Sequence, residues 1–200
     1  MDGLLVVARI LASFILGSIP FAKVAMIGTG IDITKAGSKN PGFNNVLRVC
    51  REAGIGSKNL RGAFALVGDI GKGFLALTLF SPGLTSPALL WLIGIAAVVG
   101  HCWSPFLGWN GGKGVATTVG VLVFLEWPIT LACLPLYPLL RFFGRRMGWK
   151  QEGAISSMTT MFVMSTLVFV LRGAEAGVFA YMMWIIIVIR HGPNIREILG

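Results

Sequence analysis

The sequence predicts an all-α integral membrane protein with about seven transmembrane helices, an N-terminus outside the cell and a cytosolic C-terminus. Three observations predict this fold class: the composition, the recurrence of apolar runs and the distribution of basic residues. Of the 200 residues, 55% are hydrophobic and only 12% are charged, and the mean hydropathy is +0.80. A soluble domain carries about 25% charged residues, so too few charges remain here to cover a water-facing surface.

Seven apolar runs follow one another, and several are shorter than the roughly 20 residues that a straight span needs. They cover residues 4–27, 62–80, 87–100, 114–127, 128–140, 154–171 and 174–190. The first run lacks a basic start and is too long for a signal peptide, so we expect a first span, interrupted at Gly17-Ser18-Ile19-Pro20. The fourth and fifth runs could instead form one helix that bends at Trp127-Pro128.

The basic residues decide between these two arrangements. With seven spans, the outer connections are 81–86, 127–128 and 172–173, and Arg172 is their one basic residue. The connections on the other side hold thirteen: Lys35, Lys39, Arg48, Arg51, Lys58, Arg61, Lys113, Arg141, Arg145, Arg146, Lys150, Arg190 and Arg196. Lysine and arginine are enriched in cytosolic loops, so this count favours seven spans. Six spans would place the basic residues of 141–150 on the same side as Arg172.

Composition also argues against several kinds of partner and cofactor. The net charge is +9, which in a lipid-embedded chain indicates cytosolic loops and anionic substrates, and no nucleic-acid partner is expected. Cys50, Cys102 and Cys133 form no Cys-x-x-Cys pattern, so we expect neither disulfides nor a metal site, and no cofactor. Residues 1–200 are expected to form a single membrane domain whose 27 glycines favour close helix packing.

Three polar segments could carry chemistry, and the first of them spans residues 37–48. Its candidate catalytic or phosphate-binding residues are Gly37, Ser38, Asn40, Gly42, Asn45 and Arg48. The glycines would let backbone N–H groups approach a ligand, and the Arg48 guanidinium is a planar fork that suits phosphate. The same composition also fits a solvated loop of turn-forming residues with an arginine that sets the topology.

The second segment, residues 101–118, contains a Gly-Gly-Lys-Gly turn that opens an apolar helix. Its candidates are Gly111, Gly112, Lys113, Gly114 and Thr117, with His101 as a weaker one. Such a turn offers N–H groups, a helix N-terminus and an ammonium to one anion. It is not a P-loop, because Leu107 and Gly114 stand where that motif needs glycine and a hydroxyl residue. The alternative is a flexible loop with a lysine that orients the chain in the membrane.

The third segment, residues 190–196, offers His191 and Asn194, although it could equally be a helix end with favourable cations and a proline stop. Asp69 and Lys72 lie within the second span, where charges are expensive and usually paired or functional. Because they are three residues apart on a helix, a structural ion pair is as plausible as a ligand contact.

Two expected signatures are missing. The chain contains no Gly-x-Ser-x-Gly elbow, so a serine-hydrolase arrangement has no support. Phe106 and Arg196 stand five residues after the two histidines. The His-x4-Asp signature of glycerolipid acyltransferases that use acyl-CoA or acyl-carrier protein is therefore absent.

At these segments the chain resembles the acyl-phosphate-dependent glycerol-3-phosphate acyltransferases of bacteria, the PlsY family, over essentially its whole length. That family shows a Gly-Ser-x-Pro-like break, a Gly-Ser-Gly-Asn-x-Gly-Ala-Thr-Asn-Val-x-Arg loop, an Asp-x-x-Lys-Gly span, a Gly-Gly-Lys-Gly-Val-Ala-Thr segment and a terminal Arg-His-x-x-Asn-Ile. All five have counterparts here in the same order. The chain departs from the pattern at Lys39 (glycine in the family) and at Phe43-Asn44 (Ala-Thr), and it keeps Ser157 of a Ser-x-Ala-Ser pattern.

The resemblance implies transfer of a fatty acyl group from acyl phosphate to the 1-hydroxyl of glycerol 3-phosphate. The products would be lysophosphatidic acid and phosphate, in the first acylation step of bacterial phospholipid synthesis. The residues then expected on the phosphates are Ser38, Asn45, Arg48 and Lys113 with its neighbouring glycines, and Ser157 is a further candidate for substrate binding. His191 and Asn194 would bind or orient glycerol 3-phosphate.

The resemblance also implies a location and partners. The protein would lie in the bacterial inner membrane with its site facing the cytosol, and its partners would be acyl phosphate, glycerol 3-phosphate and membrane lipids. A monomer is expected, although the residues themselves leave the oligomeric state open. The alternative function is a transporter or binding protein for organic phosphates, but the sequence shows no inverted repeat to favour it.

Overall fold

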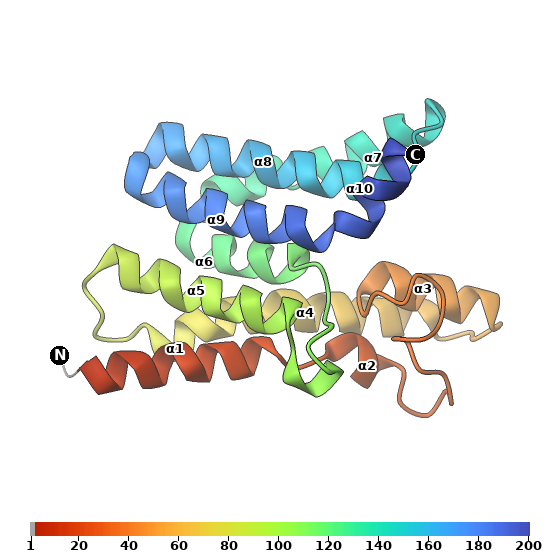
Figure 1. Cartoon of the computed structure of the whole chain (residues 1–200), viewed down its shortest axis with the longest axis horizontal. Coiled ribbons are helices and arrows are strands. Elements are labelled where there is room, and N and C mark those ends of the chain that lie inside the picture. Colours follow the sequence, from red (N-terminus) through yellow and green to blue (C-terminus); the bar gives the residue numbers. More distant parts are fainter. Residues whose placement is uncertain (1–2) are drawn as a thin grey trace.

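The computed structural model describes residues 3–200, and this part of the chain forms a helical bundle without β-strands (Figure 1). The helices are α1 (Gly3–Gly17), α2 (Phe21–Ala25), α3 (Phe43–Glu52), α4 (Lys58–Phe80), α5 (Pro87–Cys102), the 3-10 turn η1 (Pro105–Leu107), α6 (Val115–Cys133), α7 (Leu136–Arg146), α8 (Glu152–Arg172), α9 (Ala174–Arg190) and α10 (Gly192–Leu199). The all-α prediction is confirmed.

Several of these helices are suited to a membrane. Five segments of the described chain are long and apolar enough to cross one, and α9 with α10, bent by 62° between them, would make a sixth. The five are Gly3–Ala25, Lys58–Phe80, Pro87–Leu107, Val115–Cys133 and Glu152–Arg172. The polytopic membrane fold agrees with this result, whereas the count of seven spans and their orientation remain predictions.

The path of the chain through α6 and α7 bears on that count. The helical geometry of α6 breaks at Glu126 (φ −141°, ψ 48°), just before Pro128. The Glu126 carboxylate accepts a 2.7 Å hydrogen bond from Arg172, so the break lies beside the connection between α8 and α9. Farther along, Arg141 contacts Glu152, at the opposite end of α8. Residues 115–146 therefore run along the bundle and back, with the turn beside the connection between α8 and α9.

Small residues bring the helices together, as the glycine content predicts. A Cβ atom at Gly17 would overlap the backbone of Ala97, and one at Gly100 would overlap the Phe14 carbonyl, so α1 and α5 touch through their backbones. The α4–α6 pair meets in the same way at Gly73 and Gly120. Close backbone approach of this kind is how membrane helices pack without a hydrophobic driving force between them.

The break after α1 is stabilised by polar side chains from other helices. Pro20 has no N–H group, so the chain leaves helical geometry there and frees backbone carbonyls. The Ser104 hydroxyl donates to the Ser18 carbonyl at 2.7 Å, and the Lys72 ammonium donates to the Ile19 carbonyl at 2.8 Å. Lys72 also pairs with Asp69 at 2.8 Å. The structural interpretation of this charged pair therefore holds, because Lys72 is buried and bound entirely within the protein.

Candidate functional site

The connections that carry the three candidate segments gather at one end of the bundle, which we call the basic end. It is the end opposite the N-terminus, where α2, α3 and α10 lie (Figure 1). Between α5 and α6 the chain turns back: Gly111 N–H donates to the Cys102 carbonyl and Gly112 N–H to the His101 carbonyl, each at 3.1 Å. This places Lys113 at the entrance of α6.

Gly111 and Gly112 have a different role from the one predicted. Their N–H groups are used by the end of α5, so they are not free to bind a phosphate. A Cβ atom at Gly111 would overlap the His101 carbonyl, and one at Gly112 would overlap the His101 imidazole. The two glycines therefore allow the loop to lie directly against α5. The prediction that their N–H groups bind phosphate is wrong, because these groups bind the end of α5.

Gly114 is the residue of this turn that meets the helix. Its φ of +84° is left-handed, which favours glycine, and it forms the N-cap of α6 without a side-chain cap. The first N–H groups of a helix have no acceptor within it, so the start of α6 presents donors and positive dipole charge. Thr117 does not join them, because its side chain is fully buried and its carbonyl packs against Gly73 of α4.

Lys113 links the second candidate segment to the third. Its ammonium donates to the side-chain oxygen of Asn194 at 2.5 Å, and the Asn194 amide in turn donates to Gln151 at 2.6 Å. Burial, together with the neighbouring charges of Arg190 and Arg48, lowers the pKa of Lys113 to about 8. The lysine therefore lies in a positive environment and has no carboxylate partner within residues 3–200.

His191 lies buried behind this position. Its Nδ1 is 2.8 Å from the Ile187 carbonyl, which can only accept, so Nδ1 carries a proton. Its Nε2 is 3.2 Å from the Ser157 hydroxyl, whose oxygen is also 3.0 Å from the Ala154 carbonyl. The structure thus brings His191 and Ser157 together as a hydrogen-bonded pair. The sequence predicts them only as separate candidates.

The first candidate segment is organised around Asn45. Its side-chain oxygen accepts from Ser38 N–H at 2.8 Å, and its amide donates to the carbonyls of Ile33 and Ala36. Gly37 has a φ of +57° and packs directly against this amide. Asn45 therefore holds the loop in shape, and we correct its predicted role as a phosphate ligand, because both of its amide hydrogens are used and the side chain is buried.

Ser38 and Arg48 remain available in this segment. Both are exposed, and within residues 3–200 neither the Ser38 hydroxyl nor the Arg48 guanidinium has a hydrogen-bond partner. Arg48 is close enough to Lys113 for its charge to lower the lysine pKa. Asn40 and Gly42 form the turn into α3, through a 2.9 Å bond from Gly42 N–H to the Asn40 carbonyl.

Arg190 is the residue of this end that sequence reasoning undervalued. The sequence predicts for it only a place among the cytosolic basic residues. In the structure its guanidinium donates to the carbonyls of Gly112 (3.0 Å) and Gly111 (2.7 Å) and to the Asn110 side chain (3.0 Å), and it lies over the Trp103 ring. Arg190 therefore clamps the turn that carries Lys113. No local pattern indicates such a contact between residues 78 or more positions apart.

The weaker candidates also support this turn. The Asp69 carboxylate, already paired with Lys72, is 3.5 Å from Nδ1 of His101, and all three side chains are buried. Gly112 packs directly against the same imidazole. These residues form a buried polar network beneath the turn, and the structure gives them no position from which to contact a ligand.

Comparison with known proteins identifies the family. The sequence profile of the glycerol-3-phosphate acyltransferases matches residues 7–200, nearly the whole chain. The chain belongs to the glycerol-3-phosphate acyltransferase family. The glycerol-3-phosphate acyltransferase of Sulfurimonas denitrificans is 34% identical over 188 residues, covering 92% of this chain and 88% of that protein. The protein of the same name from Nostoc is 34% identical over 213 residues, covering 96% and 88%.

Solved structures of this family have the same fold. The crystal structure of PlsY (YgiH), described as an integral membrane glycerol 3-phosphate acyltransferase, superposes in its glycerol 3-phosphate form with a TM-score of 0.80. The two chains are 28% identical, and the match covers 97% of this chain and 92% of that one. The lysophosphatidic acid form gives a TM-score of 0.78 at 29% identity. This chain therefore has the helix arrangement of a solved integral membrane glycerol 3-phosphate acyltransferase.

Proposed function

We propose that this acyltransferase transfers a fatty acyl group from acyl phosphate to the 1-hydroxyl of glycerol 3-phosphate. The observation that supports this most strongly is the convergence of Lys113, the start of α6, Asn194 and the free guanidinium of Arg48 at the basic end. Both substrates carry phosphate, and ammonium, guanidinium and helix N-termini are the groups that bind phosphate best in proteins. The apolar helices beside this site provide a place for the acyl chain.

The proposed reaction requires no nucleophilic side chain of the protein. In the proposed step, the glycerol 3-phosphate hydroxyl attacks the acyl carbonyl, a new ester bond forms, and the bond from the acyl carbon to the bridging oxygen breaks. The leaving phosphate takes up the hydroxyl proton, so atoms and charges balance. The barrier is then mainly one of positioning and charge stabilisation. We assign the stabilisation of the leaving phosphate to Lys113 and the α6 N-terminus, with Ser38 and Arg48 as the exposed contacts of the first loop.

His191 and Asn194 are proposed to orient glycerol 3-phosphate. Asn194 can do so because it already contacts the Lys113 ammonium, and its α10 position follows directly after the buried His191–Ser157 pair. We propose that Ser157, whose single hydroxyl proton goes either to the Ala154 carbonyl or to Nε2 of His191, holds the imidazole in place and takes part in substrate binding through it. The product of the reaction would be lysophosphatidic acid.

The proposed setting rests on the family resemblance, and the proposed orientation on the charge distribution. We propose that residues 1–200 form one acyltransferase domain in a bacterial inner membrane, as a monomer, with the basic end in the cytosol. The thirteen basic residues expected on the cytosolic side include Lys113, Arg48 and Arg190, which gather at that end. Both water-soluble phosphates would then reach the site from the cytosol.

The choice of donor tests this proposal. With purified protein and glycerol 3-phosphate, acyl phosphate should support turnover, whereas acyl-CoA and acyl-carrier protein of the same chain length should give none above background. Both histidines lack the aspartate that partners the catalytic histidine in the enzymes that use those donors. Equal rates with acyl-CoA would contradict the assignment, and tight binding of glycerol 3-phosphate without turnover would favour the transport alternative.

The proposed role of Lys113 also predicts a pH dependence. Its pKa is lowered to about 8, so the ammonium is present below that pH and is lost as the pH rises through it. Because kcat/KM reports ionisation of the free enzyme, we expect it to fall above pH 8 by roughly tenfold per pH unit. In Lys113→Arg, the charge persists at high pH, so this fall should disappear even if the rate is lower. A wild-type profile that stays flat up to pH 10 would count against a required ammonium.

A further inference from the structure

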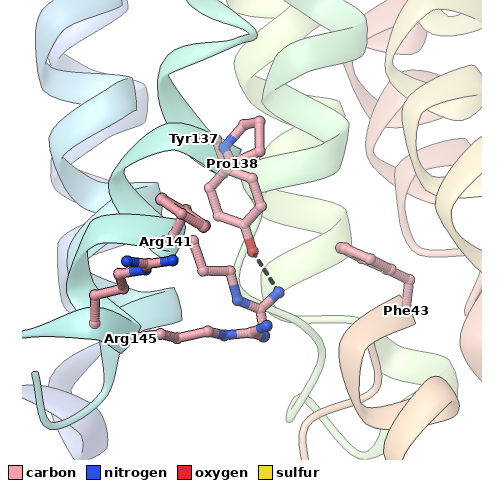
Figure 2. A pocket seen from close by; sticks show the side chains of 7 residues that line it. Phe43, Tyr137, Pro138, Arg141 and Arg145 are labelled. Atoms are coloured by element: carbon pink, nitrogen blue, oxygen red, sulfur yellow. Dashed lines mark hydrogen bonds between the residues drawn. The ribbon is translucent and has the colours of Figure 1, made fainter. Parts of the chain in front are cut away.

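A pocket lies between α7 and α3, and none of the residues assigned above to catalysis or phosphate binding lines it. Its volume is about 570 Å³. The lining residues are Phe43, Tyr137, Pro138, Arg141, Phe142, Arg145 and Arg146. Figure 2 shows the Arg141 guanidinium beneath the Tyr137 hydroxyl, with Arg145 beside it and Phe43 facing them from α3. The pocket therefore combines positive charge with aromatic rings.

The positive charge of this pocket is only partly balanced. Arg141 and Arg145 share one carboxylate oxygen of Glu152, at 3.4 Å and 3.2 Å. The Arg146 guanidinium lies over the Phe142 ring, 5.1 Å from its centre, and has no carboxylate partner within residues 3–200. Three arginines thus face one glutamate, which leaves an excess of about two positive charges for an anion from outside the protein.

Neutral polar groups hold part of the pocket in shape. Arg141 donates to the Asn44 side chain at 3.0 Å and to the Tyr137 hydroxyl at 3.3 Å, and Asn44 donates to Tyr137 at 3.4 Å. These bonds tie α7 to the start of α3. Phe43 and Asn44 are also two of the positions at which the first loop departs from the family pattern that it resembles.

The surroundings of the pocket indicate the kind of anion. Leu139, Phe142 and Phe143 of α7 are each about half exposed, on the outside of a bundle whose long helices are suited to a membrane. Arg145 and Arg146 end the same helix at the basic end. Apolar rings beside lipid tails and arginines at the level of the headgroups match an amphipathic anion better than a free one.

We propose that Tyr137, Arg141, Arg145 and Arg146 bind the phosphate of an anionic phospholipid headgroup from the surrounding membrane. The guanidinium groups would contact the phosphate, and the aromatic rings of Phe43 and Phe142 would lie against the glycerol and the first part of the acyl chains. This site is separate from the one around Lys113, and its occupation does not depend on the proposed reaction.

The test measures lipid binding without turnover. Delipidated protein in a neutral maltoside detergent is titrated with short-chain phosphatidylglycerol, and bound lipid is counted by native mass spectrometry. Phosphatidylcholine with the same chains serves as the zwitterionic comparison. The key variants are Arg146→Gln, which breaks no ion pair, and the double variant Arg145→Gln/Arg146→Gln. Arg51→Gln/Arg196→Gln is the matched control, because it removes two exposed arginines that do not line the pocket.

Wild-type protein should bind phosphatidylglycerol at least tenfold more tightly than phosphatidylcholine. Loss of one charge-assisted contact in Arg146→Gln should weaken phosphatidylglycerol binding by roughly tenfold, and the double variant should weaken it further. The control should stay within about twofold of the wild type. Equal binding of both lipids, or an equal loss in the control, would overturn the proposal. Displacement of the lipid by an equal concentration of inorganic phosphate would also overturn it, because the site would then recognise free phosphate.

Discussion

Replacing Lys113 by alanine is expected to lower kcat/KM by about ten- to hundredfold, because one charge-assisted contact to a buried phosphate contributes roughly 1.5–3 kcal/mol. The loss should be larger if the contact tightens in the transition state. Lys113→Arg should recover only part of the activity, since a forked guanidinium does not fit a space shaped around an ammonium. The measurement is steady-state kinetics on purified variants together with their yield from membranes.

Lys150→Ala is the matched control for this prediction, because Lys150 is an exposed lysine in the connection before α8. It should retain the wild-type kcat/KM. If Lys113 served only to orient the chain in the membrane, Lys113→Arg would be fully active and Lys113→Ala would lower the membrane yield without a kinetic defect. That pattern would contradict a phosphate-binding role.

The second large effect is expected in folding, at the contact between α4 and α6. A Cβ atom at Gly120 would overlap the Ile70 carbonyl. This carbonyl belongs to the backbone of α4, so it cannot move away by a change of side-chain rotamer. Added atoms in a packed interior cost about 1–3 kcal/mol, and a backbone contact should lie at the upper limit. Gly120→Ala should therefore lower the Tm by roughly 10 °C, and Gly120→Leu should give no monodisperse protein in detergent.

Gly71→Ala provides the comparison on the opposing helix. Gly71 has nothing within 4 Å of its added Cβ, so alanine there should leave the Tm unchanged or raise it slightly through its higher helix propensity. Thermal unfolding of the two alanine variants, followed by size-exclusion chromatography, checks the pair. Equal melting of Gly120→Ala and Gly71→Ala would show that α4 and α6 do not meet through this glycine.

The sequence predicts the fold class and the end of the bundle where the site lies, for physical reasons. Long apolar runs predict helices directly, because a backbone surrounded by lipid must satisfy its own hydrogen bonds and a helix does so within one segment. The convergence of Lys113 with Asn194 was also predictable in outline, since both lie in connections on the same side of the membrane. The tryptophan–proline pair alone fits a bend as well as a turn, and the distribution of basic residues was needed to predict that the chain returns there.

The individual contacts within the site could not be predicted in the same way. Asn45 and the glycines before Lys113 fit a phosphate-binding pattern, but their polar groups are used by the protein's own backbone. Arg190 fits the pattern of basic residues in cytosolic loops, but in the structure its guanidinium binds the carbonyls of Gly111 and Gly112 in the turn before α6. Residue type and local spacing indicate what a group is able to bind. The tertiary structure determines which hydrogen-bond partner it actually has.

The central claim is that this chain moves an acyl group from acyl phosphate to glycerol 3-phosphate at the Lys113 site. The most direct measurement uses acyl phosphate with a heavy-oxygen label at the bridging position and follows both products of the purified protein. We expect one phosphate for each lysophosphatidic acid, with all of the label in the phosphate, and a common loss of both products in Lys113→Ala. Label found in a carboxylate instead would mean attack at phosphorus, and would contradict acyl transfer at this site.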